Sequence, residues 1–457
     1  RSRCSNYYDE GDFMTTQNRG SLIAFISVTT LFFAWGFITN LIDPLIPAVK
    51  EIFSLSYTEA FLTQFAFFIA YGVFSLPGGA LVARAGYARA ILISLAAMVV
   101  ACLIFPLATH LRMYELVLVA LFILGGGITV LQVAANPLSA ALGDPKTSHS
   151  RLVLSQAFNS LGTVLGPYLG AAVMLSGGMF AVAAAGGDVE VARAASLKKI
   201  DTSFVMVAGM IVLLALFMWS QSRRITASAP PVTAEKGSVF DALKARWALF
   251  GGISIFVYVG AEVAIASLMI NFLTQPDVLL PHLKNPEGTT VLGIFHFVGE
   301  PAERAGKMLG WLYWFGAMVG RFAGSALLAR IRAPKLLALF AFVAAMLSLT
   351  VSQTHGELAA YAALSVGLFN SIMFPCIFTI TLERSTATVA GTSGLLCMAI
   401  VGGAFIPQVV ARIADAGHLH AAYFVPMLCY LLIVLFALGA LKAPIVSHGT
   451  APGAAPH

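Results

Sequence analysis

The stretch FFAWGFITNLIDPLIP, residues 32–47, places an acidic residue, Asp43, inside an apolar run near the start of the chain. A second apolar stretch, IFVYVGAEVAIASLM at residues 255–269, contains Glu262. A carboxylate in hydrocarbon costs at least a few kcal/mol, so it is normally buried, paired or protonated, and it marks a functional pathway. Two such acids, one in each half, indicate a protein that moves a substrate across a membrane and uses protons to do so.

The composition supports a membrane protein along the whole chain. Of the 457 residues, 59% are hydrophobic and 11% are charged, and the mean hydropathy is +0.87. Soluble domains carry about 25% charged residues, so this chain falls outside that class. Four of the five cysteines lie in apolar stretches without metal-like spacing, and we expect them to be free buried thiols.

Apolar stretches long enough to span a bilayer recur from end to end. We predict an all-α membrane protein with twelve spans, near residues 21–49, 57–82, 89–109, 114–141, 151–176, 202–221, 247–275, 306–330, 334–353, 357–382, 390–413 and 421–441. These spans predict two six-helix bundles, with the following divisions: a tail at 1–20, a first bundle at 21–221, a cytoplasmic linker at 222–246, a second bundle at 247–441 and a tail at 442–457. Residues 1–13 differ in composition from the rest, and we expect them to be an addition or an over-extended start.

The distribution of basic residues gives the orientation. With both termini inside, inner segments hold 17 Lys and Arg residues and outer segments hold 9, whereas the acids divide as 7 inside and 12 outside. Basic residues concentrate in cytoplasmic loops. The net charge of +6 therefore faces lipid headgroups, and no nucleic-acid partner is expected.

A pattern of small and basic residues that occurs in both halves of the chain indicates that the halves are related. GGALVARAGYARA follows the second span and GSALLARIRAPK follows the eighth, so a small-residue helix end meets an Arg-containing inner turn in both halves. Parallel repeats of this kind are typical of transporters with a substrate site between the halves. Gly162, Gly166 and Gly170 recur every four residues and predict close helix packing.

The residues near each acid allow a functional and a structural interpretation. Asn40 shares a helix face with Asp43, and Pro44 weakens the helix that follows. An amide and an acid at such a place can bind a polyol, but Asp43 can also be a structural acid paired with Lys50. Glu262 can likewise be a buried acid satisfied by a neighbouring hydroxyl or by Arg321.

Amides inside the spans are the candidate ligands of a neutral sugar. Amide groups donate and accept hydrogen bonds, which matches sugar hydroxyls, although they also join helices in membranes. Aromatic rings can cover the apolar face of a sugar. The predicted substrate contacts are Asn40, Gln132, Asn136, Gln156, Asn159, Glu262, Asn271, Asn370 and Trp35, and the predicted proton-coupling residues are Asp43 and Glu262.

Sequence signatures of enzymes and metal sites are missing. The chain lacks a G-x-x-x-x-G-K-[ST] phosphate loop, an H-E-x-x-H motif, a paired C-x-x-C and a G-x-S-x-G motif. We expect no enzyme activity, no metal and no cofactor, with a proton gradient as the driving force.

The motifs resemble a known family. LQVAANPL, LSQAFNSLG, YVGAEVAI, GRFAGS, FNSIMFPCIFTITLE and SGLLCMAIVGGAFIP occur in an order similar to the fucose–proton symporters of the major facilitator superfamily, in their glucose/galactose branch. The resemblance covers residues 20–441 and implies alternating access. It implies coupling at Asp43 and sugar contacts at Asn40, Gln156 and Asn159. The fucose branch has an acid where this chain has Gln132 and a glutamine where this chain has Glu262, which favours the hexose branch.

We therefore expect a monomeric bacterial inner-membrane symporter, with both termini cytoplasmic, that imports a neutral hexose with a proton. Whether Glu262 titrates or binds sugar stays open at this point. The alternatives are an N-acetylglucosamine carrier of the same family, a proton/drug antiporter and a membrane sensor that does not transport.

Overall fold

The computed structural model describes residues 9–142, 148–180, 188–229, 242–291, 293–328, 330–387 and 389–446. The first part of the chain forms α1 (Asp9–Asn40), α2 (Ile42–Phe53), α3 (Tyr57–Ala60), α4 (Leu62–Ala85), α5 (Tyr87–His110), α6 (Tyr114–Ala141), α7 (Ser148–Met174) and α9 (Val189–Ser228).

The second part contains helices and one small hairpin. In chain order its elements are α11 (Arg246–Leu273), α12 (Leu280–Leu283), β1 (Thr289–Val291), β2 (Phe295–Phe297), α13 (Pro301–Met308), η2 (Leu309–Trp314), α14 (Phe315–Leu328), α15 (Ala333–Gln353), α16 (Gly356–Asn370), α17 (Met373–Arg384), α18 (Val389–Met398), η3 (Ala399–Val401), α19 (Gly402–Asp415), η4 (Ala421–Tyr423) and α20 (Phe424–Lys442). The hairpin pairs β1 with β2 in antiparallel register, with Thr290 opposite His296.

The predicted multi-pass helical architecture is confirmed. Within the described residues, ten helical segments are long and apolar enough to cross a membrane. The two remaining predicted spans are also helical: 151–176 falls on α7, and 306–330 falls on α13, η2 and α14. All twelve predicted stretches therefore form helix.

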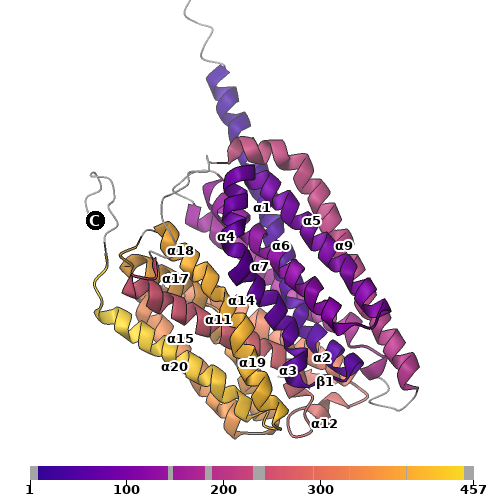
Figure 1. The fold of residues 1–457 in the computed structure, drawn as a ribbon. Helices are drawn as coiled ribbons and strands as arrows, with labels where there is room; N and C mark the ends of the chain where they lie inside the picture. Colours follow the sequence, from indigo (N-terminus) through magenta and orange to yellow (C-terminus); the bar gives the residue numbers. More distant parts are fainter. Residues whose placement is uncertain are drawn as a thin grey trace, which may run out of the picture.

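Several helix ends differ from the prediction. α1 begins at Asp9, inside the expected tail, and projects beyond the other helices (Figure 1). The sixth span, predicted to begin near residue 202, belongs to α9, which already begins at Val189. Asp188 caps this helix by accepting from the backbone N–H groups of Glu190 and Val191. α9 also continues into the expected linker as far as Ser228. Linker residues 230–241 and the terminal residues 1–8 and 447–457 lie outside the described part.

Prolines interrupt two spans. The first span divides at Leu41 into α1 and α2, just before Pro44, as the sequence predicts. The tenth span divides at Ser371 and Ile372 into α16 and α17, just before Pro375. Proline cannot donate to the carbonyl four residues earlier, so each interruption leaves backbone free for other contacts.

Glycines bring α7 close to α1. A Cβ atom on Gly166 would lie 2.6 Å from the Phe37 carbonyl oxygen, and one on Gly36 would lie 2.6 Å from Nδ2 of Asn159. Gly162 meets the backbone of Phe33 in the same way. The predicted packing role of the glycines in the fifth span is therefore confirmed.

The two halves of the chain meet at the end of the molecule that carries α3, α12 and β1 (Figure 1). There the carboxylate of Asp415, at the end of α19, accepts from the backbone N–H groups of Tyr57 at 2.5 Å and Thr58 at 2.8 Å. A residue of the second half thus caps the first turn of α3 in the first half. With both termini placed inside, this contact lies on the outer face.

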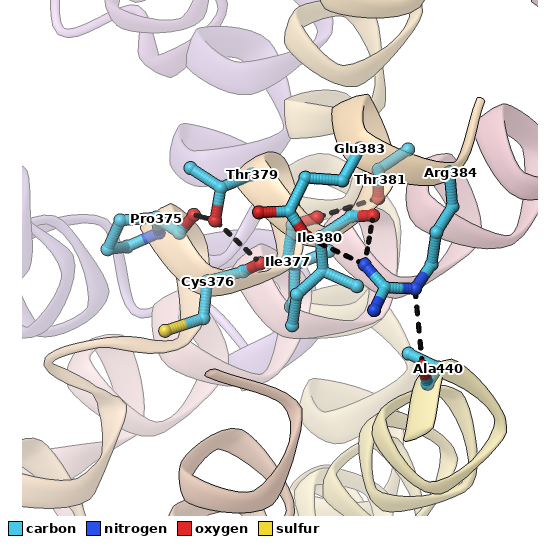
Figure 2. A network of polar contacts seen from close by, with 9 residues as sticks. All are labelled: Pro375, Cys376, Ile377, Thr379, Ile380, Thr381, Glu383, Arg384 and Ala440. Atoms are coloured by element: carbon cyan, nitrogen blue, oxygen red, sulfur yellow. Dashed lines mark hydrogen bonds and ion pairs between the residues drawn. The ribbon is translucent and has the colours of Figure 1, made fainter. Parts of the chain in front are cut away.

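At the opposite face, Arg384 ties α17 to α20. Figure 2 shows its guanidinium directed toward Ala440, with Ile380 and Glu383 beside it. The side chain is buried and donates to the carbonyl oxygens of Ala440 and Ile380, each at 3.2 Å, and to Glu383 at 2.8 Å. Of these acceptors, the Ala440 carbonyl lies in the last turn of α20, where carbonyl groups have no partner within the helix.

We predict that Arg384→Ala lowers the free energy of unfolding by about 2–3 kcal/mol, because it removes the buried hydrogen bond of a charged group that joins α17 to the last turn of α20. The matched variant Glu383→Gln should cost less than about 1 kcal/mol, because that carboxylate is half exposed. The measurement is unfolding in mixed micelles followed by tryptophan fluorescence. Equal effects of the two variants would contradict this role for Arg384.

Candidate functional site

Asp43 lies in the first turn of α2, directly after the break at Leu41, and is buried. Its Oδ2 accepts from the indole N–H of Trp314 at 3.2 Å, and its Oδ1 accepts a longer bond from Gln64 at 3.4 Å. Gln64 also donates to the hydroxyl of Ser267 at 2.8 Å. Because Trp314 and Ser267 belong to the second half, the acid of the first half is held by residues from both.

The partner of Asp43 comes from an unusual piece of helix. η2, residues Leu309–Trp314, is a π-helix inserted between α13 and α14. A π-helical turn widens the helix and changes the direction of its side chains, and it is frequent at functional sites. Here it contains two consecutive buried aromatic residues, Tyr313 and Trp314, whose ring centroids lie 5.1 Å apart with an interplanar angle of 88°.

Glu262 lies in the middle of α11 within a group of hydroxyl and amide side chains. The hydroxyl of Tyr258, one turn earlier, donates to Oε1 of Glu262 at 2.8 Å and lies 3.2 Å from the Asn370 carbonyl oxygen. Asn370 donates to the Tyr313 hydroxyl at 2.8 Å. The expectation that a neighbouring hydroxyl satisfies Glu262 therefore holds for one of its two carboxylate oxygens.

The two acids are connected through η2. Trp314 contacts Asp43, and the adjacent Tyr313 contacts Asn370, which lies beside the Tyr258 partner of Glu262. Within the described residues, neither acid forms an ion pair with a lysine, arginine or histidine. Neutral groups alone donate to the two carboxylates among the described residues, although the Arg321 guanidinium is near enough to act electrostatically on Glu262.

The pairing of Asp43 with Lys50 is not observed. The Lys50 ammonium lies over the ring of Tyr57, 4.5 Å from the centroid. Arg321 does not pair with Glu262 either, because its guanidinium donates to Ser160 of α7. This contact joins α14 of the second half to α7 of the first half.

The predicted amides occupy different surroundings. Gln132 is half-buried and donates to the Tyr71 hydroxyl at 2.9 Å. Asn136, one turn later, has a buried side-chain oxygen without a hydrogen-bond partner in the structure. Asn40 is buried and donates to the Gly36 carbonyl oxygen of its own helix at 2.9 Å.

The two predicted amides of α7 also have different surroundings. Asn159 donates to the Phe32 carbonyl oxygen of α1 at 3.0 Å, so its geometry is that of a contact between helices. Gln156, one turn earlier, is half-buried. In the second half, Asn271 is buried near the end of α11, and its side-chain nitrogen has no partner in the structure. Trp35 is buried on α1 and packs on Phe32, with ring centroids 4.1 Å apart.

Four polar residues around the acids were not predicted from the sequence: Gln64, Ser267, Tyr258 and Tyr313. Tyr258 was detectable, because it precedes Glu262 by four residues and so shares its helix face. Gln64 is a lone amide in an apolar span, which is also a signal. Ser267 and Tyr313 gave none, because their contacts depend on how distant helices pack.

Residues 24–407 match the model of the Major Facilitator Superfamily. A glucose/galactose transporter of Brucella abortus biovar 1 (strain 9-941) is 40% identical over 425 residues, which cover 93% of this chain and 95% of that protein. An L-fucose-proton symporter of Escherichia coli (strain K12) is 28% identical over 440 residues, 92% of this chain and 94% of that protein.

A solved structure has the same fold. The structure of FucP, a transporter of the Major Facilitator Superfamily crystallised in the outward conformation, superposes with a TM-score of 0.66. The match covers 92% of this chain and 99% of that chain, at 26% sequence identity.

We predict an energetic coupling of about 1.5–3 kcal/mol between Asp43 and Trp314, the range for a hydrogen bond to a charged group. A double-mutant cycle with Asp43→Leu and Trp314→Phe, read out as unfolding free energy in mixed micelles, measures it. Trp311→Phe is the matched control, because Trp311 lies on the same π-helix but is partly exposed. Additivity within about 0.5 kcal/mol in the Asp43–Trp314 cycle would show that the contact contributes nothing.

Proposed function

Since this chain belongs to the Major Facilitator Superfamily, we propose that it imports a neutral hexose of the glucose/galactose type together with a proton. The relatives named above are a glucose/galactose transporter and an L-fucose-proton symporter, and the chain is a transporter of their family, not an enzyme. The high coverage of both relatives supports carrying the substrate class and the proton coupling over to the whole chain.

One observation carries the mechanism: the buried carboxylate of Asp43, in the first half, accepts from Trp314 in the second half. A hydrogen bond to an ionised carboxylate is roughly twice as strong as one to a neutral acceptor. Protonation of Asp43 therefore weakens the contact between the halves and removes a buried charge at the same time. In this proposal, proton binding and the relative movement of the halves are coupled through that bond.

We assign Glu262 to the sugar and not to the coupling proton. Its side chain is less buried than that of Asp43, and only one of its two carboxylate oxygens has a hydrogen-bond donor among the described residues. An ionised carboxylate with a free oxygen can accept sugar hydroxyls without changing its protonation. Tyr258 would then hold the carboxylate in a fixed orientation for the ligand.

The remaining sugar contacts are proposed from the amides. Asn136 has an unpartnered acceptor and Asn271 an unpartnered donor, so both have hydrogen-bonding capacity to offer a ligand. Gln132, Gln156 and Asn370 lie in the spans of both halves and complete a set that can bind hydroxyls by donation and acceptance. Asn40, Asn159 and Trp35 would shape the site from α1 and α7, with Asn159 also joining these helices.

Alternating access requires that contacts at the outer ends of the halves break and reform. The Asp415 carboxylate on the first turn of α3 is such a contact, and its two hydrogen bonds close the outer end. We further propose a bacterial inner-membrane location with both termini cytoplasmic, a monomeric carrier in the lipid bilayer, and a proton gradient as the only driving force.

Asp43→Asn should abolish proton-driven accumulation of hexose, because an amide cannot take up the coupling proton, while exchange of labelled for unlabelled hexose continues. The measurement is uptake and counterflow of labelled glucose and galactose in proteoliposomes with and without an inward pH gradient. Unlabelled N-acetylglucosamine in the same assay tests the alternative substrate.

Glu287→Gln is the matched control, because it removes an exposed acid of the outer loop and should leave accumulation unchanged. Full gradient-driven accumulation by Asp43→Asn would rule out Asp43 as the coupling residue.

Glu262→Gln should raise the KM for hexose about 10-fold, because a neutral amide oxygen accepts a weaker hydrogen bond than a carboxylate by about 1.4 kcal/mol. At saturating hexose the accumulation ratio should stay as in the unmodified protein. The two readouts separate the roles of the residue: lost accumulation with intact counterflow would mean that Glu262 carries the coupling proton.

A further inference from the structure

Three side chains from distant parts of the chain meet on the outer face of the second half. Among the described residues, one group of three metal-ligating types has its ligand atoms within 4.8 Å of one another: Asp277, His355 and His420. Asp277 follows α11, His355 precedes α16, and His420 precedes η4. The pairs are separated by 78 and 143 residues, so no local motif marks them.

Both histidines contact the same oxygen. Nδ1 of His355 lies 3.0 Å from Oδ2 of Asp277, and Nε2 of His420 lies 3.1 Å from it. A tetrahedral metal ion about 2.0–2.1 Å from each ligand separates neighbouring ligand atoms by about 3.3 Å. Both N···O distances are close to that separation, and all three ligand atoms lie within 4.8 Å of one another.

The orientation of His420 makes it a ready metal ligand. Its Nδ1 lies 3.0 Å from the Val351 carbonyl oxygen, which can only accept, so Nδ1 carries the hydrogen. In the neutral ring, Nε2 then carries a lone pair and is an acceptor. It faces Oδ2 of Asp277, which is also an acceptor. At this distance either a proton on Nε2 or a metal ion must lie between the two acceptors. A backbone carbonyl that fixes the tautomer of a histidine is the usual outer support of a metal ligand.

The position of His420 is also fixed by packing. Its ring contacts Phe272 of α11, with centroids 5.1 Å apart, and the same Phe272 packs on Tyr423. The His420 side chain is only 16% exposed, whereas Asp277 and His355 are 50% and 68% exposed. One ligand is thus held in place, and two can adjust around an ion that enters from solvent with water as its fourth ligand.

From this geometry we propose that Asp277, His355 and His420 form a binding site for a divalent transition-metal ion of the zinc type. Two imidazoles and a carboxylate with an open position suit zinc, whereas magnesium and calcium prefer oxygen ligands. No metal site was predicted from the sequence, because these three residues are far apart in the chain and form no local motif.

The site would stabilise the outer end of the second half. The ion would join the turn after α11, the turn between α15 and α16, and the turn between α19 and α20. All three ligands belong to one half, so the ion would not lock the two halves together. Its effect would be to hold the outer end of α11, the helix that contains Glu262.

The experiment is zinc titration of the purified full-length protein without a polyhistidine tag, after chelator treatment. We expect one zinc ion per chain by competition with a fluorescent chelator, and a rise of a few degrees in apparent Tm at saturating zinc. His420→Asn and His355→Ala should each weaken zinc binding at least about 10-fold and remove the rise in Tm.

His418→Ala is the matched control, because this exposed histidine lies in the same turn outside the cluster, and it should bind zinc as the unmodified protein does. Two outcomes would overturn the proposal. One is zinc binding that all three variants retain equally. The other is a Tm that responds to pH but not to zinc or chelator, because a proton and not a metal would then lie between His420 and Asp277.

Discussion

The hydrogen bond from the Trp314 indole to the buried Asp43 carboxylate is the interaction on which the proposed coupling of proton and hexose depends. It is a contact between the two halves at an ionisable group, and no basic side chain shares the charge among the described residues. A buried carboxylate held only by neutral donors is sensitive to its own protonation. A change of one proton at this position therefore changes both the local charge and the contact between halves.

The surrounding structure places these two groups together. The break at Leu41, imposed by Pro44, starts a new helix whose first turn contains Asp43. In the π-helix η2, Tyr313 contacts Asn370 and the adjacent Trp314 contacts Asp43. The close packing of α1 on α7, which glycines permit, fixes the position of the first span. The first two features interrupt regular α-helix beside the acids, and the third holds the first span in place.

Local signals in the sequence were enough to predict the spans, the proline break and the glycine packing. A long apolar run, a proline and a four-residue glycine repeat each have direct structural consequences. The partners of the acids were not predictable, because Trp314 reaches Asp43 across 271 positions of the chain through a π-helix with no sequence signature. For the same reason the Asp277 cluster was missed. The start of α9 was misjudged because a capping aspartate extended the helix into a polar stretch.

The most direct test of the central claim is proton movement during transport. Hexose added to lightly buffered, de-energised cells that produce the protein should make the external medium more alkaline, and cells with Asp43→Asn should give no such change while still exchanging hexose. The account would be contradicted by hexose entry in the unmodified protein without any change in external pH, or by equal alkalinisation with Asp43→Asn.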